Sequence, residues 1–216
     1  MKNLILLITA MFVSLNFAQA EVYKFENNEK GLQFVISKNV KKGDDDFGAT
    51  DVVGHFKKYN GSFDYDAAKN TVKDLKVEIE VSSIDTDMPK RDKHLRSADF
   101  FNVEDHPKAT FISEAGKSFK VAKDGSAEIT GNLKIKDVSK AITLKVNTKM
   151  QGDKLMIMAP KDAYNVTFDR RDYGIKYNKT IDDDLLGSLA SKFKSFVGKN
   201  VIGDLAQIKL NITATK

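Results

Sequence analysis

The chain has 216 residues, with 35 Lys and Arg against 30 Asp and Glu, a net charge of +5 at pH 7, and no cysteine. The lack of cysteine excludes a disulfide framework, a thiolate metal site, a thiol nucleophile and a lipoprotein anchor. Charges of both signs are interspersed and no run of Lys or Arg exceeds two residues, which argues against a nucleic-acid-binding surface.

The start of the chain carries the three parts of a secretory signal peptide. Lys2 supplies a positive charge, residues 4–17 form an apolar run, and Ala18-Gln19-Ala20 is a small-x-small cleavage site. The alternative is an uncleaved membrane anchor, but the run is shorter than the roughly 20 apolar residues that span a bilayer. We therefore expect 1–20 to be a signal peptide cleaved after Ala20, and 21–216 to form one domain outside the cytoplasm.

Alternation of apolar and polar residues dominates the remaining sequence and predicts an all-β fold. The clearest run is Leu75-Lys76-Val77-Glu78-Ile79-Glu80-Val81, in which every odd position is aliphatic and every even position is charged. Such a strand has one dry and one wet face. Similar alternation predicts strands over 32–36, 127–135, 142–146, 164–168 and 206–212, and weaker alternation predicts strands over 22–25, 54–56, 62–65, 110–113, 119–122 and 155–158.

Turn signals separate these strands at Asn60-Gly61, Lys123-Asp124-Gly125 and Gln151-Gly152-Asp153. Eight or more strands joined by short turns predict a meandering antiparallel sheet. Because each strand has one apolar face, the sheet must close on itself or pack on a second sheet, and closure also removes exposed edges. The pattern favours a barrel over a sandwich.

Two segments depart from the alternation. Residues 89–101 are polar and predict a short helical segment near 90–100. Residues 182–197 open with three aspartates, which suit a helix N-terminus, and then place apolar residues at helical spacing, so they predict an amphipathic helix. That helix packs on the barrel, forms a lid over its mouth, or docks on a membrane through Phe193 and Phe196.

Several motifs closely resemble the signature of the YceI family. They are Val81-Ser82-Ser83-Ile84-Asp85-Thr86, Arg91-Asp92-Lys93-His94-Leu95-Arg96-Ser97-Ala98-Asp99-Phe100-Phe101, His106-Pro107-Lys108-Ala109-Thr110-Phe111-Ile112-Ser113, Val53-Gly54-His55-Phe56 with Gly61, 129–135, and Arg171-Asp172-Tyr173-Gly174-Ile175. The resemblance runs from about residue 22 to residue 212. It implies a lipocalin-like, eight-stranded antiparallel barrel in the periplasm, whose interior binds the chain of an isoprenoid quinone or a polyprenyl precursor as a carrier or store.

Two places depart from the family pattern. A histidine that family members often carry near the end of the second strand is replaced here by Lys38 or a neighbour, and the following loop, 41–51, looks longer than usual. The helix predicted over 182–197 also looks expanded. These differences bear on the mouth of the barrel and on its ligand.

The inward positions of the predicted strands are apolar. They either pack a solid core or line a cavity that holds one slender ligand, since a barrel of about eight strands allows both. The family resemblance favours the cavity. The predicted lining residues are Phe34, Ile36, Phe56, Phe63, Leu75, Val77, Ile79, Leu133, Ile135, Ile142, Leu144, Val166, Phe168, Ile208 and Leu210.

The densest polar cluster comprises Arg91, Asp92, His94 and Arg96, and Arg171-Asp172 forms a second. Either cluster meets a phosphate or quinone head group at the mouth, or holds the turns between strands through hydrogen bonds. The second role is the more common one for polar residues in such turns.

The sequence offers little for chemistry. His55, His94 and His106 do not have metal-ligand spacing, the aspartates at 44–46 and 182–184 lack EF-hand spacing, and no nucleophile motif is present. We therefore expect no metal, no cofactor other than a bound isoprenoid lipid or quinone, and no enzymatic activity. The alternatives are an enzyme that uses Arg91, Asp92 and His94, and an interaction protein that docks through the 182–197 helix. The expected partners are the lipid and transiently a membrane or membrane protein, without nucleic acid, for a monomer or homodimer.

Overall fold

The computed structural model describes residues 20–42, 46–176 and 201–216. The helical elements are α1 (Pro89–Arg96) and the 3-10 turns η1 (Val81–Ser83) and η2 (Arg170–Tyr173). The strands are β1 (Glu21–Phe25), β2 (Leu32–Lys42), β3 (Asp46–Phe56), β4 (Tyr59–Asp66), β5 (Thr71–Glu80), β6 (Ile84–Asp85), β7 (Lys108–Ser113), β8 (Ser118–Lys120), β9 (Ser126–Ile135), β10 (Val138–Gln151), β11 (Lys154–Met158), β12 (Val166–Asp169) and β13 (Val201–Thr215).

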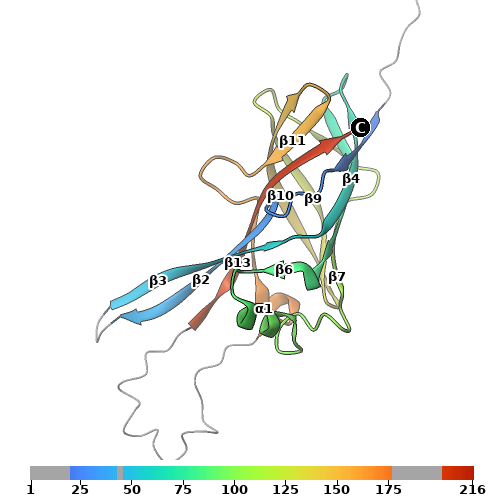
Figure 1. The fold of residues 1–216 in the computed structure, drawn as a ribbon. Helices are drawn as coiled ribbons and strands as arrows, with labels where there is room; N and C mark the ends of the chain where they lie inside the picture. Colours follow the sequence, from blue (N-terminus) through green and yellow to red (C-terminus); the bar gives the residue numbers. More distant parts are fainter. Residues whose placement is uncertain (1–19, 43–45, 177–200) are drawn as a thin grey trace, which may run out of the picture.

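Eight antiparallel strands close into a barrel, which confirms the predicted fold class. Their order around the ring is β1-β4-β5-β7-β9-β10-β11-β13, and β13 pairs with β1 to complete it. The 15-residue strand β13 is shared by two sheets: its C-terminal half pairs with β11 and β1, and its N-terminal half pairs with β12 and β2. The sheet continues from β13 through β2, β3 and β6, and these strands form one side of the wall at the end of the barrel where α1 lies (Figure 1).

The hairpin of β2 and β3 extends far beyond the barrel wall (Figure 1). Its strands pair without interruption from Gln33 with His55 to Lys42 with Asp46. The loop predicted over 41–51 is therefore wrong, because all of that segment except 43–45 belongs to the two strands. The segment 41–51 is rich in charged and small residues, a composition typical of loops. The hydrogen bonds that pair its strands are formed by the backbone, however, and do not require an apolar pattern of side chains.

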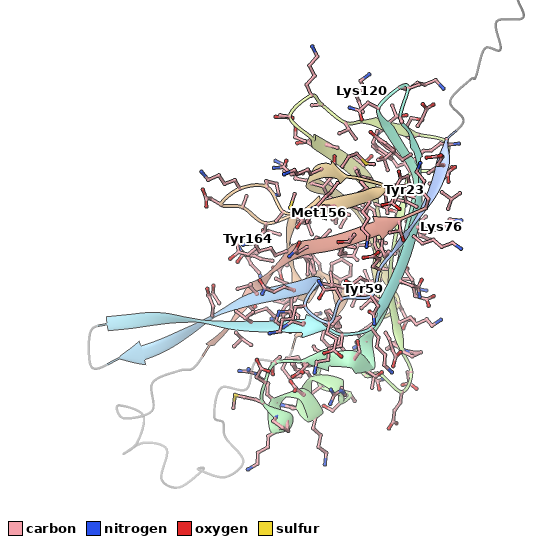
Figure 2. The ribbon with its side chains drawn as sticks, turned by 45° about the horizontal axis from the view of Figure 1, so that its top comes forward. Tyr23, Tyr59, Lys76, Lys120, Met156 and Tyr164 are labelled. Carbon is pink, nitrogen blue, oxygen red and sulfur yellow. The ribbon has the colours of Figure 1, made fainter. Side chains whose placement is uncertain are left out.

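The end of the barrel remote from the hairpin is packed by aromatic rings. The Tyr23 and Phe63 rings stack with centroids 5.5 Å apart, and Tyr65 meets Tyr23 edge to face at 6.0 Å. Lysines occupy the outward positions of the wall, and Figure 2 shows Lys76 on β5 and Lys120 on β8 pointing away from the barrel. The alternation in the sequence thus separates a dry interior from a wet exterior.

The helix predicted near 90–100 is present as α1, which covers the opposite end of the barrel (Figure 1). Pro89 occupies its first position, where a missing N–H costs nothing, and Lys93, His94 and Arg96 lie in its last turn. The helix predicted over 182–197 lies outside the described residues. Within the described ranges, no helix combines the length and apolar character that crossing a bilayer requires.

Candidate functional site

The barrel encloses an apolar cavity of about 310 Å³. This volume falls at the lower end of the range for small-molecule sites in proteins. Every lining residue predicted from the sequence, from Phe34 on β2 to Leu210 on β13, lies in its wall. Their contact with a ligand stays a prediction, but the interior is hollow in its middle as well as apolar.

A bulge in the wall keeps the charged side chain of Lys73 out of the cavity. Strict alternation backward from Leu75 would turn Lys73 inward, but the register between β4 and β5 shifts so that Asp74 and Leu75 both stand opposite Phe63. Asp74 accommodates the bulge with a φ of 52°. Consequently Val72 and Leu75 both line the cavity, whereas Lys73 stays outside with its Nζ 3.4 Å from an Asp64 carboxylate oxygen.

The cavity reaches solvent beside α1. His94 lines the cavity although its side chain is 40% exposed, and its Nε2 lies 2.8 Å from an Asp99 carboxylate oxygen. Phe100 and Phe101, in the turn after α1, complete this end of the wall. The Phe101 ring meets Phe56 edge to face, with centroids 6.1 Å apart. This end is therefore the mouth, and aromatic rings surround it.

The polar cluster at the mouth is largely engaged in holding the turn between β6 and α1. Asp92 is buried and accepts hydrogen bonds from the backbone N–H and the hydroxyl of Thr86. Arg91 donates from Nε to the Thr86 hydroxyl and from Nη2 to the Thr86 carbonyl, both at 2.7 Å. Arg96 donates to the carbonyls of Ser82, at 2.7 Å, and Ile84. Of the four predicted residues, only Arg91 and His94 line the cavity.

A family model for the YceI-like domain matches residues 23–214, which is almost the whole described barrel. The chain belongs to this family.

YceI-like relatives with substantial identity come from several bacteria. A UPF0312 protein of Pseudomonas aeruginosa is 35% identical over 164 residues, covering 73% of this chain and 79% of the relative. A UPF0312 protein of Pectobacterium carotovorum is 36% identical over 156 residues, covering 71% of this chain and 76% of the relative.

Two solved structures share the fold at low identity. Burkholderia cenocepacia BcnA superposes with a TM-score of 0.58 at 21% identity, covering 84% of this chain and 96% of that one. A polyisoprenoid binding domain from Saccharophagus degradans gives a TM-score of 0.56 at 14% identity, covering 89% and 97% of the two chains. These likenesses establish the barrel architecture.

Arg170 is a lining residue of this YceI-like barrel that sequence reasoning missed. It is 2% exposed and donates from Nε to the Gly203 carbonyl at 3.0 Å and from Nη1 to the Ile175 carbonyl at 2.6 Å, with Asp204 at 3.5 Å from Nη2. Burial lowers the pKa of its guanidinium, although Asp204 opposes the shift. The alternation that turns Val166 and Phe168 inward also turns Arg170 inward, so the sequence pattern could have identified it as a lining residue.

The predicted pair Arg171-Asp172 lies outside the cavity wall. Arg171 forms an ion pair with Asp169 that lowers the pKa of that carboxyl to about 2, and it also contacts Asp204 at 3.0 Å. Asp172 pairs with Lys140 at 2.9 Å. Both residues thus fasten the η2 turn to neighbouring strands and do not reach a ligand in the cavity.

The histidines of the described residues do not gather with other metal-ligating side chains, and no group of three His, Asp or Glu residues there forms a metal site. His55 Nε2 lies 3.3 Å from the side-chain nitrogen of Gln33, and His106 Nε2 lies 3.6 Å from an Asp137 carboxylate oxygen. The side chain of Lys38, at the position where the family often has histidine, lies outside the described side chains.

Proposed function

We propose that this protein binds an isoprenoid lipid in its barrel and carries or stores it in the periplasm. The observation that carries the proposal is the apolar cavity of about 310 Å³, whose wall includes the partly exposed His94 on α1. The structural likeness to a protein described as a polyisoprenoid binding domain supports it. A lipid chain needs such a cavity because it has few polar groups with which a protein could otherwise recognise it.

The cavity can bind a lipid chain tightly without specific polar contacts. Burying each methylene-sized group contributes about 0.8 kcal/mol, so ten such groups contribute roughly 8 kcal/mol before the entropic cost of association is subtracted. Among the described lining residues, the polar side chains are Arg91, His94, Thr148 and Arg170, so the chain meets almost no polar surface.

The hydrogen bonds at the mouth favour an uncharged head group. Arg91 donates to Thr86, and Arg170 donates to two backbone carbonyls and approaches Asp204. A phosphate would have to displace these acceptors to gain bidentate contacts from either guanidinium. An isoprenoid quinone makes no such demand, and we propose it as the ligand in preference to a polyprenyl phosphate.

The proposed location follows from the signal peptide predicted over residues 1–20. A lipid confined to membranes cannot cross an aqueous compartment unaided, so a soluble barrel between two membranes gives it passage. The transient contact with a membrane or membrane protein belongs to this proposal, and so does a monomeric or homodimeric state. Docking through the helix predicted over 182–197 stays a prediction.

We propose binding without catalysis. The Arg91, Asp92 and His94 side chains do not all reach the cavity: Asp92 is buried against Thr86, and Arg91, which lines the cavity with His94, already donates two hydrogen bonds to Thr86. The wall offers a bound chain apolar contacts on almost every side.

The test is extraction of the purified mature protein with organic solvent, followed by mass spectrometry. We expect an isoprenoid lipid at near-stoichiometric amount. Ile142→Trp fills the cavity from β10 and is expected to abolish loading, whereas Ala141→Trp, on the exposed face of the same strand, is expected to preserve it. Equal loading of the two variants, or a protein that purifies without lipid and binds none when isoprenoids are added, contradicts the proposal.

A further inference from the structure

Two phenylalanine rings in the cavity wall each lie over a glycine on the neighbouring strand. Gly54 on β3 stands directly opposite Phe34 on β2. A Cβ atom at position 54 would lie 2.3 Å from Phe34 Cζ, 2.5 Å from Phe34 Cε1 and 2.8 Å from Thr86 Cγ2, so the Phe34 ring is its nearest neighbour. The ring therefore occupies the space that any other residue would fill with its own side chain.

The same arrangement occurs on the adjoining part of the wall. A Cβ atom at Gly61 on β4 would lie 2.5 Å from both Cδ2 and Cε2 of Phe25 on β1, and 3.0 Å from the Lys76 carbonyl oxygen. Phe25 and Gly61 adjoin the paired residues Lys24 and Ser62. Phe25 and Phe34 both line the cavity. In both strand pairs an aromatic ring of the cavity wall thus covers a glycine on the neighbouring strand.

Backbone conformation does not explain these glycines. Neither Gly54 nor Gly61 has the positive φ that favours glycine, unlike Gly116, Gly125, Gly152 and Gly174. Their missing side chains therefore serve the packing of the rings.

A side chain at either position would narrow the cavity. Carbon atoms in contact keep about 3.5–4.0 Å apart, so an alanine at position 54 must move the Phe34 ring by roughly 1 Å. Strand β3 lies on one side of the ring and the cavity that Phe34 lines lies on the other, so we expect the ring to move toward the lumen. A cavity of about 310 Å³ is small enough for such a movement to matter to a chain that bears branches.

We infer that Gly54 and Gly61 are specificity determinants, which set a bore wide enough for a methyl-branched isoprenoid chain and not merely for a straight acyl chain. The inference rests on the proposed function and adds the feature that selects the class of chain. An isoprenoid carries a methyl group on every fourth carbon of its main chain, so it needs a wider passage than an unbranched chain of the same length.

Gly131 on β9 also lies beneath an aromatic ring, but its neighbours include backbone atoms at equally short distances. A Cβ atom there would lie 2.6 Å from Cζ of Phe111, 2.4 Å from the Ile112 carbonyl oxygen and 2.7 Å from Ser113 Cα. Substitution of Gly131 would therefore shift β7 and β9 as well as the ring, so this position does not test the width of the cavity alone.

The experiment measures binding of geranylgeraniol and of hexadecan-1-ol, which has the same sixteen-carbon main chain without methyl branches. In mature Gly54→Ala we expect geranylgeraniol affinity to fall by roughly tenfold and hexadecanol affinity to change by less than about threefold, as for one methyl group in a fitted pocket. Gly54→Ala combined with Phe34→Leu removes the ring, which is the nearer of the two side chains that clash, and is expected to restore the affinity ratio; the contact with Thr86, which does not line the cavity, remains in both variants. Gly61→Ala repeats the test on the other strand pair.

Phe34→Leu alone keeps the inference testable if the alanine variants do not fold, because it removes ring atoms without overpacking. It is expected to shift the affinity ratio by a few fold in favour of geranylgeraniol. Circular dichroism and the thermal midpoint establish that each variant is folded. An unchanged ratio in the folded variants, or an equal loss for both alcohols in Gly54→Ala, overturns the inference. A wild-type protein that binds neither alcohol nor any isoprenoid overturns the proposed function instead.

Discussion

Asp92 is the position at which a structural role and a ligand-binding role predict different results. It is 5% exposed, and its Oδ1 accepts hydrogen bonds from the Thr86 N–H, at 3.0 Å, and from the Thr86 hydroxyl. Asp92→Ala leaves two buried donors without this acceptor, at about 1–3 kcal/mol each. We expect the free energy of unfolding to fall by roughly 2–4 kcal/mol after the turn relaxes.

The matched variant Asp92→Asn keeps an oxygen that can accept both bonds and loses only the charge. We expect it to cost about 1 kcal/mol, because a hydrogen bond to a neutral acceptor is weaker by about half. Urea unfolding of the mature proteins, followed by circular dichroism, measures both values. Geranylgeraniol binding is then measured under conditions in which every variant is folded, and we expect its affinity to stay within about threefold of wild type, since Asp92 does not line the cavity.

The reasoning is refuted if Asp92→Ala unfolds with nearly the wild-type free energy but loses lipid binding. Asp92 would then act on the ligand, and the polar cluster would be a head-group site. A large loss of stability accompanied by intact binding in the folded fraction supports the structural role.

Two further predictions concern titratable groups in and beside the η2 turn. The Tyr173 hydroxyl is buried without a hydrogen-bond partner among the described residues, and burial raises its pKa to about 12. Tyr173→Phe is therefore expected to leave the free energy of unfolding unchanged or to raise it by up to about 1 kcal/mol. Tyr59→Phe removes a hydrogen bond to the Asn28 carbonyl and is expected to lower the free energy of unfolding. A lower thermal midpoint for Tyr173→Phe than for Tyr59→Phe contradicts this. Because pairing with Arg171 lowers the pKa of Asp169 to about 2 from 3.8, the pair stabilises the fold above about pH 4 and this stabilisation is lost as the pH falls toward 2. In Arg171→Gln the thermal midpoint is expected to fall less steeply over that range, and an identical pH profile would count against the pairing.

The inner face of the barrel could be predicted because it depends on a local rule. Successive side chains of a strand point to opposite faces, so Leu75, Val77 and Ile79 identify one another as neighbours from the sequence alone. Arg170 obeys the same rule, yet a charged residue is not expected inside an apolar wall without the carbonyls of Gly203 and Ile175 that accept its hydrogen bonds. Those partners lie on other segments, and the sequence does not place them together.

The polar cluster and the hairpin show what sequence alone leaves open. Arg96 donates a hydrogen bond to the carbonyl of Ser82. This contact depends on how α1 packs against β6 and not on the spacing of the two residues along the chain. Residues 41–51, at the far end of the hairpin of β2 and β3, have the composition of a loop, because the backbone hydrogen bonds that pair these strands do not depend on composition. The bulge at Asp74 likewise arises only when β4 and β5 are brought into register.

Strand β13 has a consequence for the order in which the fold can form. It joins β1, β2, β11 and β12, and it is the last described strand along the chain. The contact between β1 and β13 spans nearly the whole domain in sequence and carries a correspondingly large loop-closure entropy. The ring of strands therefore cannot close until β13 has been synthesised, and until then β1 and β11 each have an edge that lacks its partner strand.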